Sequence, residues 1–409
     1  MIKGKDIVII GMQAWDIEIG SNCKNIATEF AKYNRVIYVN NPLSIIDFFK
    51  AKKSEPLEKR KRVVFAKENG LKQVSSNLWE FNPKTVFAPT NRIKQNFIFD
   101  RLTRYNAKKL FKEILRALTD LEFKDYILFN DSSMFLGEQL RILLNPSSFI
   151  YYIRDNLVNS PFSYWNLHGK RYEALLIKAA DVVVTNSIYY TEYARNFNTN
   201  SHMVGQGCDV SLFDFKLREI ITAKELTAIK GPIIGYVGYL ASIRLDIDLL
   251  EFIAKSRADW SIVLVGPEDS TFANSNLHSY DNVHFLGAKE GTNLPNYIKG
   301  FDVCINPQLM NETTKGNYPR KIDEYLAMGK PVVATKTIAM GYFKDWVFLA
   351  ETKEDYLLLI EKANKSNSIV LENSRREYAL THSWENNIKK IGHALESTEL
   401  INLKNKIKC

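Results

Sequence analysis

The sequence predicts an α/β protein with two parallel sheets, each covered by its own helices. Short apolar runs of strand length recur along both halves of the chain, with helical patterns between them. The alternation is interrupted once, at the turn-forming residues 205–209, which are followed by a polar stretch over residues 211–230. Alternating strands and helices are typical of parallel sheets, and such an interruption is typical of a domain boundary. A length of 409 residues also fits two or three domains.

Composition places the chain among globular proteins that bind anions. Apolar residues make up 45% and charged residues 25% of the sequence, as in ordinary soluble domains. The net charge of +9 favours nucleotides, phosphorylated lipids, nucleic acid or an acidic membrane face as partners. The 4 cysteines are far apart and do not cluster with histidines, so no zinc site is indicated and a reducing compartment is expected. No apolar run approaches ~18 residues, which predicts a cytoplasmic protein with at most peripheral membrane contact.

In the first half, the apolar runs predict strands over residues 6–10, 36–39, 126–130, 149–153, 181–186 and 202–204. Residues 22–33 have the pattern of the first helix. The loop between the first strand and this helix lacks the G-x-G-x-x-G pattern of dinucleotide-binding domains. We therefore do not expect this half to bind a dinucleotide.

Two basic segments stand out in the first half. Residues 50–62 carry seven Lys or Arg with little apolar content, and we interpret them as a mobile loop. Residues 101–118 carry six more, alternating with apolar residues that share one helical stripe. One interpretation is a surface helix with a core face and a solvated face. The other is that both segments form a peripheral footprint on an anionic leaflet.

Residues 154–170 follow a predicted strand and are rich in aromatic and polar side chains, which favours a pocket wall over a simple connection. They contain Asp155 and His168. A single histidine is more often a structural residue than a base, so the pattern alone assigns no chemistry to His168.

In the second half, strands are predicted over residues 232–237, 260–265, 283–286, 301–305 and 331–335. Two of them end in glycine loops, at residues 238–244 and 266–269. Glycine allows backbone N–H groups to approach a phosphate or a base closely. Asp246 and Asp248 form a D-x-D pattern, but they open a predicted helix, where the helix dipole favours acids, so we do not interpret them as a metal site.

Residues 316–335 combine a polar loop, a helix and a buried strand. Pro319 suits the first turn of the helix, and Gly329 followed by Pro331 ends it. Arg320 and Lys321 lie in the first turn, where cations oppose the helix dipole, which suggests that an anion docks there. The alternative is that both pair with acids at helical spacing in the same helix.

The second half resembles bacterial family 4 glycosyltransferases, which have the GT-B fold. The resemblance is carried, in order and spacing, by I-G-Y-V-G-Y-L from Ile234, W-S-I-V-L-V-G-P-E-D from Trp260, N-V-H-F-L-G from Asn282, L-P-N-Y-I from Leu294 and Y-P-R-K-I-D-E-Y-L-A-M-G-K-P-V-V-A-T from Tyr318. It is looser in the first half, at A-D-V-V-V-T-N-S from Ala180 and G-Q-G-C-D-V-S-L-F from Gly205, and does not extend to residues 50–121.

The resemblance implies the arrangement of domains and a set of donor-binding residues. It implies an acceptor-binding Rossmann-like domain over residues 1–207, a nucleotide-sugar-binding one over 208–380, facing it across a cleft, and a C-terminal helix over 381–409 that returns to the first domain. Glu324 would accept hydrogen bonds from ribose, and backbone groups at Gly266, Gly287 and Lys289 would hold the base. The diphosphate would be bound by Gly238, Arg244, Arg320 and Lys321. The donor sugar would face Glu312, Thr313, Thr314, Gly316, Asn317 and Tyr318.

This sequence departs from the family pattern at one position of the donor site. Many members have a second glutamate eight positions before the one matched by Glu324, and Gly316 stands there. Glu312, or backbone N–H groups at Gly316 and Asn317, would have to replace it. Arg244 is the expected substitute for a lysine that commonly follows the first strand of this domain.

The resemblance implies transfer of a sugar from a nucleotide-diphosphate donor to a glycan or polyprenyl-diphosphate-linked acceptor in surface polysaccharide assembly. Retention at the anomeric carbon is implied, with no metal and no cofactor, because fixed cations can stabilise the departing diphosphate. Asp155 and His168 are the candidates for an assisting catalytic group. The expected location is the cytoplasm, with peripheral contact to the inner membrane face through residues 50–62 and 101–118.

Two other functions remain open at this point. A nucleotide-sugar epimerase or isomerase of the same fold would turn over its substrate without an acceptor. A non-catalytic protein that binds nucleotides or nucleic acid would fit the charge, but the basic segments show little aromatic interleaving and no recognised nucleic-acid module.

Overall fold

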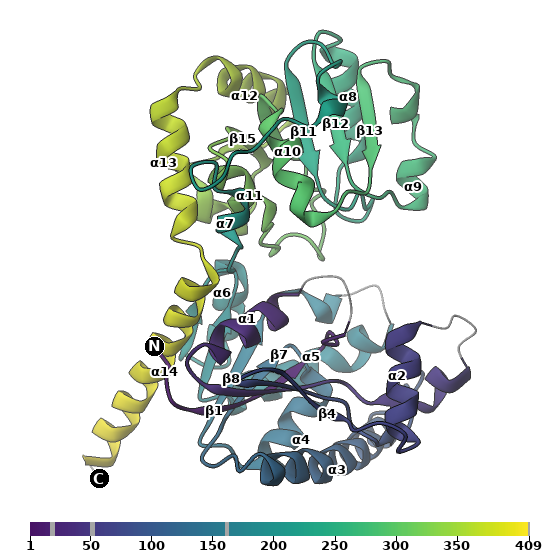
Figure 1. The fold of residues 1–409 in the computed structure, drawn as a ribbon, viewed down its shortest axis with the longest axis vertical. Coiled ribbons are helices and arrows are strands. Elements are labelled where there is room, and N and C mark those ends of the chain that lie inside the picture. Colours follow the sequence, from purple (N-terminus) through teal and green to yellow (C-terminus); the bar gives the residue numbers. More distant parts are fainter. Residues whose placement is uncertain (17–20, 50–53, 160–162, 408–409) are drawn as a thin grey trace. The chain divides into compact units, whose positions relative to one another are not determined.

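The computed structural model describes residues 1–16, 21–49, 54–159 and 163–407 and divides the chain into two compact units (Figure 1). Unit 1 comprises Met1–Gly205 and Asn387–Cys409, and unit 2 comprises Gln206–Asn386. The chain therefore passes from one unit to the other twice. The first crossing, between residues 205 and 206, lies two residues before the predicted boundary at 207. The second, between residues 386 and 387, lies within the predicted C-terminal segment 381–409 rather than at its start.

Unit 1 is built on an eight-stranded sheet with the order β10-β9-β8-β7-β1-β2-β5-β4. All neighbours are parallel except β4 and β5. The strands are β1 (Asp6–Gly11), β2 (Arg35–Val39), β4 (Leu71–Ser75), β5 (Leu78–Phe81), β7 (Ile127–Asp131), β8 (Ser148–Ile153), β9 (Val182–Thr185) and β10 (Ser201–Met203). A separate parallel pair joins β3 (Leu43–Ser44) to β6 (Val86–Phe87).

The predicted strands of unit 1 are confirmed. Its central strands are buried on both faces and therefore consist largely of apolar residues, which made them recognisable in the sequence. Strand β4 could not be recognised in this way. Its residues, L-K-Q-V-S, are mostly exposed, and it forms the antiparallel edge of the sheet. An edge strand with charged and polar side chains has no apolar run by which it could be recognised. Such side chains protect the edge from pairing with further strands.

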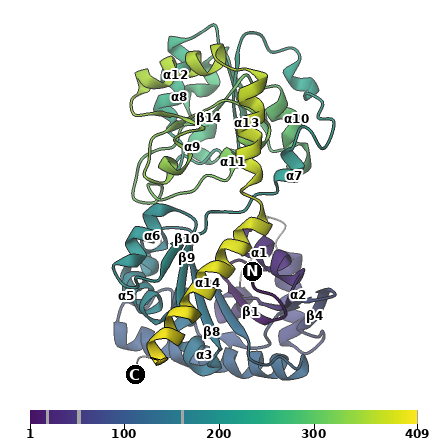
Figure 2. The ribbon, with the colours of Figure 1, turned by 90° about the vertical axis from the view of Figure 1, so that its left-hand side faces the viewer.

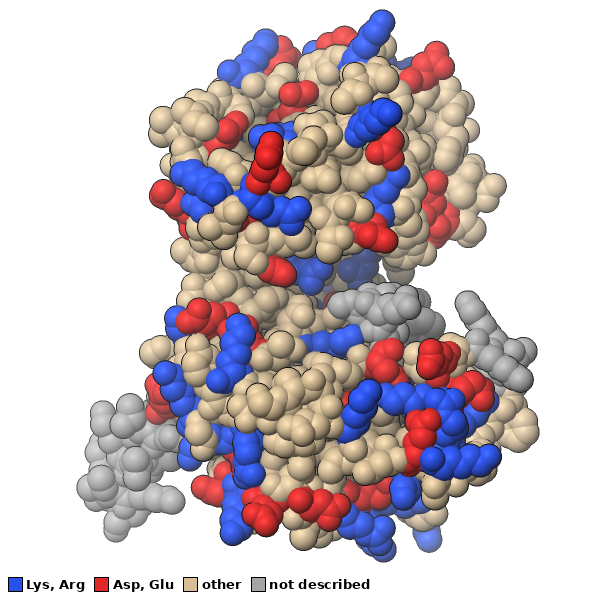
Figure 3. Space-filling view, viewed as in Figure 1, with Lys and Arg blue, Asp and Glu red and all other residues tan. Residues whose placement is uncertain are grey.

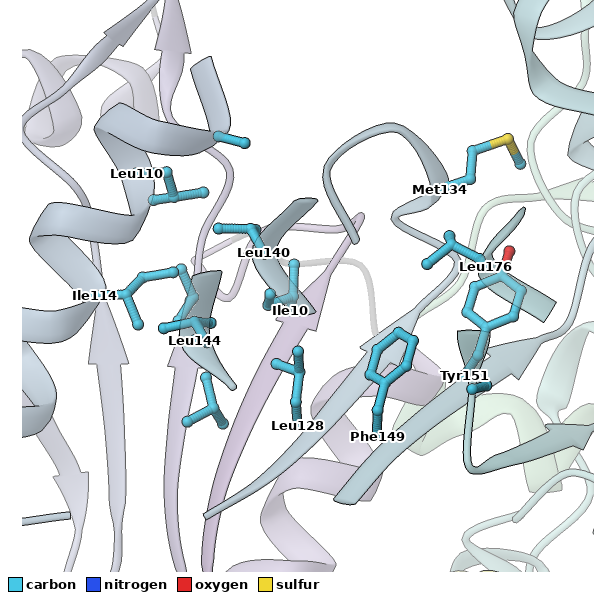
Figure 4. Close-up of a cluster of buried hydrophobic side chains, with 14 of the residues drawn as sticks. Ile10, Leu110, Ile114, Leu128, Met134, Leu140, Leu144, Phe149, Tyr151 and Leu176 are labelled. Atoms are coloured by element: carbon cyan, nitrogen blue, oxygen red, sulfur yellow. The ribbon is translucent and has the colours of Figure 1, made fainter. Parts of the chain in front are cut away.

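The helices of unit 1 are α1 (Asn22–Ala31), α2 (Glu55–Val64), α3 (Asn96–Asp120), α4 (Met134–Leu144), α5 (Ser163–Ala179), α6 (Ile188–Arg195) and most of α14 (Trp384–Ile407). Figure 4 shows how the apolar faces of α3, α4 and α5 meet the sheet, with Leu110, Leu140 and Leu176 directed towards side chains of β1, β7 and β8. These residues are almost completely buried.

The interpretation of residues 50–62 as a loop is wrong for the part that the structure describes. Residues 55–64 form α2, which begins after Ser54 and has a proline in its first turn, while residues 50–53 lie outside the described residues. The cations of α2 are paired with acids from α2 itself and from other elements: Lys59 with Glu80, Arg60 with Asp16, Lys61 with Glu58 and Arg62 with Glu68. Basic and acidic atoms accordingly lie side by side at this place in Figure 3. Two of these partners, Glu80 and Asp16, are distant in sequence, so the local pattern could not show them.

Unit 2 is a six-stranded parallel sheet with the order β13-β12-β11-β14-β15-β16. The strands are β11 (Ile233–Val237), β12 (Ser261–Val265), β13 (Val283–Gly287), β14 (Val303–Asn306), β15 (Val332–Thr335) and β16 (Phe348–Ala350). The helices are α7 (Val210–Phe213), α8 (Ile247–Ser256), α9 (Ser270–Ala273), α10 (Leu294–Lys299), α11 (Lys321–Ala327), α12 (Lys353–Lys365) and α13 (Ile369–Leu380). Val263 and Val265 of β12 belong to one apolar cluster and Ile262 and Leu264 to another, so both faces of the sheet are covered.

The two segments in which the chain crosses between the units, near residues 205 and 386, are joined by hydrogen bonds within each unit. In unit 1, the buried amide of Asn387 donates to the carbonyls of Val204 and Gly205, at 3.2 and 3.0 Å. In unit 2, the backbone N–H of Cys208 donates to the carbonyl of His382 at 2.8 Å. The predicted C-terminal helix over 381–409 begins at Trp384 as α14, and residues 381–383 separate it from α13. Figure 2 shows α14 lying along unit 1 beyond this interruption.

Among the residues that the structure describes, no helix combines the length and the hydropathy needed to cross a bilayer.

Glu173 of α5 gives unit 1 a measurable pH dependence. Its carboxylate is 3% exposed and accepts a hydrogen bond from the hydroxyl of Tyr151 at 3.4 Å. Burial raises the pKa of Glu173 to about 7, and hydrogen bonds from Tyr193 and Tyr151 only partly oppose this. The folded state therefore keeps the proton to a higher pH than the unfolded state. The contribution of Glu173 to the free energy of unfolding is fully present below about pH 4.5 and is lost as pH rises to about 7.

Replacing Glu173 by glutamine should remove this loss. Relative to wild type, the free energy of unfolding of Glu173→Gln should rise by about 3 kcal/mol between pH 4.5 and pH 8, as measured by urea unfolding. Glu192→Gln, at an exposed position of α6, is the control and should show no such change. A constant difference between Glu173→Gln and wild type across this range would contradict the assignment.

Candidate active site

The candidate site lies at the edge of the unit 2 sheet where the strands end. Because β11 to β15 are parallel, their carboxyl ends share one edge, where α/β proteins bind ligands. Gly238 follows β11, Gly266 follows β12, Gly287 ends β13, and α11 follows β14 after an ordered loop. The structure thus brings together the donor-binding elements that the sequence predicts.

The two glycine loops touch each other. Gly238 has φ of 141° and Gly266 has φ of 154°, values that side chains rarely allow. A Cβ atom at Gly266 would lie 1.9 Å from the carbonyl oxygen of Gly238, and one at Gly238 would lie 3.1 Å from Nζ of Lys321. The N–H of Gly238 also donates to the carbonyl of Val265 at 2.9 Å. Glycine is therefore required at Gly266 by both the backbone angle and the close approach.

Lys321 places a positive charge beside these loops. Its ammonium group donates to the hydroxyl of Tyr236 and lies 4.2 Å from the centre of that ring. Tyr236 is 2% exposed, so it fixes the position of the ammonium group. Within the described part of the chain, no carboxylate forms an ion pair with Lys321. Its charge is available to an anion at the glycine loops.

Arg320 and Lys321 do not behave alike. Nε of Arg320 lies 3.2 Å from Oε1 of Glu324, at the i, i+4 spacing of the alternative interpretation. Glu324 is 8% exposed; burial raises its pKa, and the charges of Arg320 and Lys321 oppose this. The helix itself is short, from Lys321 to Ala327, and begins two residues after Pro319. The attraction for an anion therefore comes mainly from the side-chain cations rather than from a long helix dipole.

The loop that carries Arg244 is tied to the loop before α11. The carbonyl of Arg244 accepts a hydrogen bond from the N–H of Leu309, and the side-chain amide of Asn311 donates to the carbonyl of Ile243, each at 2.8 Å. Asp269 supports the same loop by accepting from the N–H and hydroxyl of Ser242, at 2.6 and 2.8 Å. Arg244 is exposed, and the described residues offer it no carboxylate partner.

The predicted sugar-facing residues divide into surface and buried positions. Glu312 is exposed and pairs with Lys315 at 2.7 Å, whereas Gly316 is buried. The N–H groups of Thr313 and Thr314 donate to the side chain of Asn311, and the N–H of Asn317 donates to the carbonyl of Thr314. The N–H of Asn317 is thus already used within the loop, and does not supply the expected substitute for a carboxylate at Gly316.

The predictions for Thr314 and Tyr318 as sugar contacts need correction. Thr314 is 1% exposed, and its hydroxyl bonds to the carbonyl of Leu309. Tyr318 is 3% exposed and donates its hydroxyl to Asp323 at 2.9 Å. Both side chains therefore act as hydrogen-bond partners of other groups in the protein, as buried polar groups require. The local sequence does not reveal such partners.

The sequence did not identify the buried network beneath α11. Asp323 is fully buried and accepts hydrogen bonds from Nδ1 of His382 at 2.6 Å and from Tyr318. Burial raises the pKa of Asp323, and the bonds from His382 and Tyr318 oppose this. One feature of the sequence could have indicated this network. Apolar residues such as Ile322 and Tyr325 occur on all sides of α11, so the acids between them must also be buried. This network holds α11, and hence Lys321, in place.

Two of the predicted base-binding residues, Gly287 and Lys289, lie at the end of β13 and beyond it, whereas Gly266 lies in the glycine loop after β12. Gly287 is exposed with φ of 68°. The ammonium group of Lys289 pairs with Glu225 at 2.7 Å and lies 5.3 Å from the ring centre of Tyr297. Its charge is therefore compensated within unit 2, and a contact of its backbone with a base stays a prediction.

Of the two catalytic candidates in unit 1, the structure argues against His168. Its ring is 0% exposed, stacks on Phe99 with ring centres 3.8 Å apart, and bonds through Nε2 to the carbonyl of Ile93 at 2.8 Å. An imidazole enclosed in this way cannot reach a substrate, so the structural role is the correct one. Asp155 follows β8, is 36% exposed at its side chain and lies 3.2 Å from Nη1 of Arg154. Its catalytic role stays a prediction.

The described residues contain no group of three or more His, Cys, Asp or Glu side chains arranged to hold a metal ion. Asp246 instead caps α8, where its carboxylate accepts from the N–H of Leu249 at 2.9 Å. The acids of the D-x-D pattern therefore belong to a helix start.

Comparison with known protein families matches the part of unit 2 that contains the candidate site. Residues 231–364, which contain the glycine loops, Lys321 and Glu324, match the family model described as Glycosyl transferases group 1. These residues of unit 2, which we call the group 1 domain, are therefore similar to group 1 glycosyl transferases. Over 231 residues the chain is 25% identical to the Bacillus subtilis (strain 168) protein named "Putative teichuronic acid biosynthesis glycosyltransferase TuaH". That match covers 53% of this chain and 56% of the Bacillus protein, just over half of each.

Solved structures show that the fold around the group 1 domain is GT-B, which confirms the predicted fold class. Anabaena Alr3699/HepE in complex with UDP aligns with a TM-score of 0.64 and 15% identity, covering 96% of this chain and 100% of that one. Trehalose 6-phosphate synthase from Burkholderia multivorans aligns with a TM-score of 0.66 and 10% identity, covering 99% of both chains. Sucrose-phosphate synthase from Thermosynechococcus elongatus aligns with a TM-score of 0.63 and 14% identity, covering 98% of this chain and 100% of that one.

Proposed function

We propose that the protein is a glycosyltransferase that moves a sugar from a nucleotide-diphosphate donor to a glycan or lipid-linked acceptor. The observation that carries this proposal is the unpaired charge of Lys321, held by Tyr236 beside two touching glycine loops in a group 1 domain. Negative charge accumulates on the departing diphosphate as the glycosidic bond breaks. A fixed cation at that position stabilises the transition state more than the ground state.

The proposed donor site has separate places for the diphosphate and the nucleoside. Lys321 and Arg244 bind the diphosphate, while Glu324 accepts hydrogen bonds from the ribose hydroxyls. Burial raises the pKa of Glu324, and the ion pair with Arg320 opposes this rise, which favours the carboxylate form that accepts such bonds. HepE has been crystallised with UDP and with UDP-glucose, which supports a nucleoside diphosphate sugar as the donor class here.

The acceptor part of the proposal rests on the Bacillus relative, whose name assigns it to teichuronic acid biosynthesis. A surface polysaccharide precursor is accordingly the proposed acceptor class. We propose retention without a metal, with the departing phosphate taking the acceptor proton, because the burial of His168 removes one of the two predicted protein groups. Asp155 is the remaining protein group for this role.

A thermal-shift series with nucleoside diphosphates and their sugars tests the donor assignment. A ligand at about 100 times its Kd adds about 2.7 kcal/mol to the stability of the state that binds it, so at least one should raise Tm by several degrees. The same bases as nucleosides, without phosphate, should give much smaller shifts. If every nucleoside diphosphate left Tm unchanged, the assignment would fail, and donor turnover without any acceptor would favour the epimerase alternative.

A further inference from the structure

The outward face of α3 exposes large apolar side chains among basic ones. Phe97 is 73% exposed, Tyr105 is 53% exposed and Ile98 is 45% exposed. The opposite face of the same helix, which includes Phe99 and Leu110, is buried in the core of unit 1. Large apolar side chains that gather on one exposed surface are typical of an interaction site.

The exposed residues occupy one continuous strip along the helix. At 100° per residue, the side chains of Phe97, Ile98, Arg101, Arg104, Tyr105 and Lys108 fall within an arc of about 120°. Lys112, Leu115 and Arg116 continue the same arc towards the end of α3, and all three are exposed. We call the first six residues the α3 strip.

The charges of the α3 strip are not compensated within the described part of the chain. Arg101, Arg104 and Lys108 form no ion pair there, in contrast to the paired cations of α2. The acids of α3 are engaged or distant: Asp100 pairs with Arg171 at 2.6 Å, Glu113 accepts from the N–H of Lys84, and Asp120 is the last residue of the helix. Basic atoms line the lower right edge of unit 1 in Figure 3, where Figure 1 places α3.

We propose that the α3 strip docks unit 1 on the surface of an anionic phospholipid bilayer. Apolar side chains flanked by cations match such a surface, because the apolar groups enter the boundary of the acyl chains while the cations contact the headgroups. A soluble polyanion would attract the cations but would give Phe97 and Ile98 no apolar environment. Each basic side chain near an anionic leaflet strengthens binding about fivefold. The proposal is independent of the donor site in unit 2, and α2 takes no part in it.

Co-sedimentation of the full chain with phosphatidylcholine vesicles, with and without phosphatidylglycerol, tests the proposal. Wild type should bind the anionic vesicles, bind the neutral ones at least tenfold more weakly, and lose affinity as salt is added. The triple substitution Arg101→Gln, Arg104→Gln and Lys108→Gln should weaken binding about a hundredfold. Phe97→Ser with Ile98→Ser should weaken it at least tenfold while keeping the preference for anionic vesicles.

A matched control separates the strip from net charge. The triple substitution Lys255→Gln, Lys299→Gln and Lys353→Gln removes the same charge from exposed positions of unit 2 and should bind vesicles like wild type. All variants should melt at the wild-type temperature, because the substituted side chains are exposed. Equal loss in both triple variants, or no binding of wild type to anionic vesicles, would overturn the proposal. So would binding to an RNA or DNA oligonucleotide that depends on the strip while vesicle binding does not.

Discussion

Replacing Lys321 by methionine is expected to lower kcat/KM for glycosyl transfer by about 10²- to 10³-fold, or about 3 to 4 kcal/mol of transition-state stabilisation. Methionine keeps much of the length and the packing of lysine but removes the charge that faces the departing diphosphate in the proposed mechanism. Affinity for a nucleoside diphosphate should fall strongly, whereas affinity for the corresponding nucleoside should hardly change. Steady-state kinetics and calorimetric titration with both ligands would measure the two effects.

Lys299→Met provides the matched control for Lys321→Met. Lys299 ends α10 and precedes β14, so it lies towards the opposite edge of the unit 2 sheet, and its side chain is exposed. Kinetics and nucleotide affinity should remain at the wild-type level. If Lys321→Met retained wild-type affinity for the nucleoside diphosphate, its assignment to the phosphate site would be wrong.

Replacing Gly266 by alanine is expected to cost about 2 to 4 kcal/mol of stability and to weaken nucleoside diphosphate binding at least tenfold. The added Cβ would lie 1.9 Å from the carbonyl oxygen of Gly238, at a φ of 154°. The two glycine loops would have to separate, and Gly238 would then move relative to Lys321. Urea unfolding measures the first effect, and calorimetric titration measures the second.

Gly291→Ala makes the same chemical change where the structure has room for it. A Cβ atom at Gly291 meets no atom within 4 Å, and the backbone is not in the left-handed region. Stability should stay within about 0.5 kcal/mol of wild type, and nucleotide binding should not change. Equal effects of the two substitutions would show that the contact between the loops is unimportant.

The sequence by itself determined the two-sheet α/β architecture and the edge of the sheet that carries the candidate site. Strands buried on both faces must be continuous apolar runs, and helices that cover them must repeat apolar residues along one face. Gly238, Gly266 and Lys321 could be placed at one edge because parallel strands end together. These are local patterns, and a local pattern is visible in a single sequence.

Only the tertiary structure decided which polar side chains are available to a ligand. Thr314 and Tyr318 were expected to face the donor sugar and His168 to assist catalysis, but all three are buried. Tyr318 bonds to Asp323, and the other two bond to backbone carbonyls. Two of the four cations of α2 are neutralised by acids from distant parts of the chain, whereas Arg101, Arg104 and Lys108 of α3 have no ion pair among the described residues. The partner of a buried or charged group is set by contacts between residues far apart in the sequence. For this reason the sequence indicated the candidate anion site, while only the fold distinguished Lys321, which has an unpaired charge within the described part of the chain, from the buried residues around it.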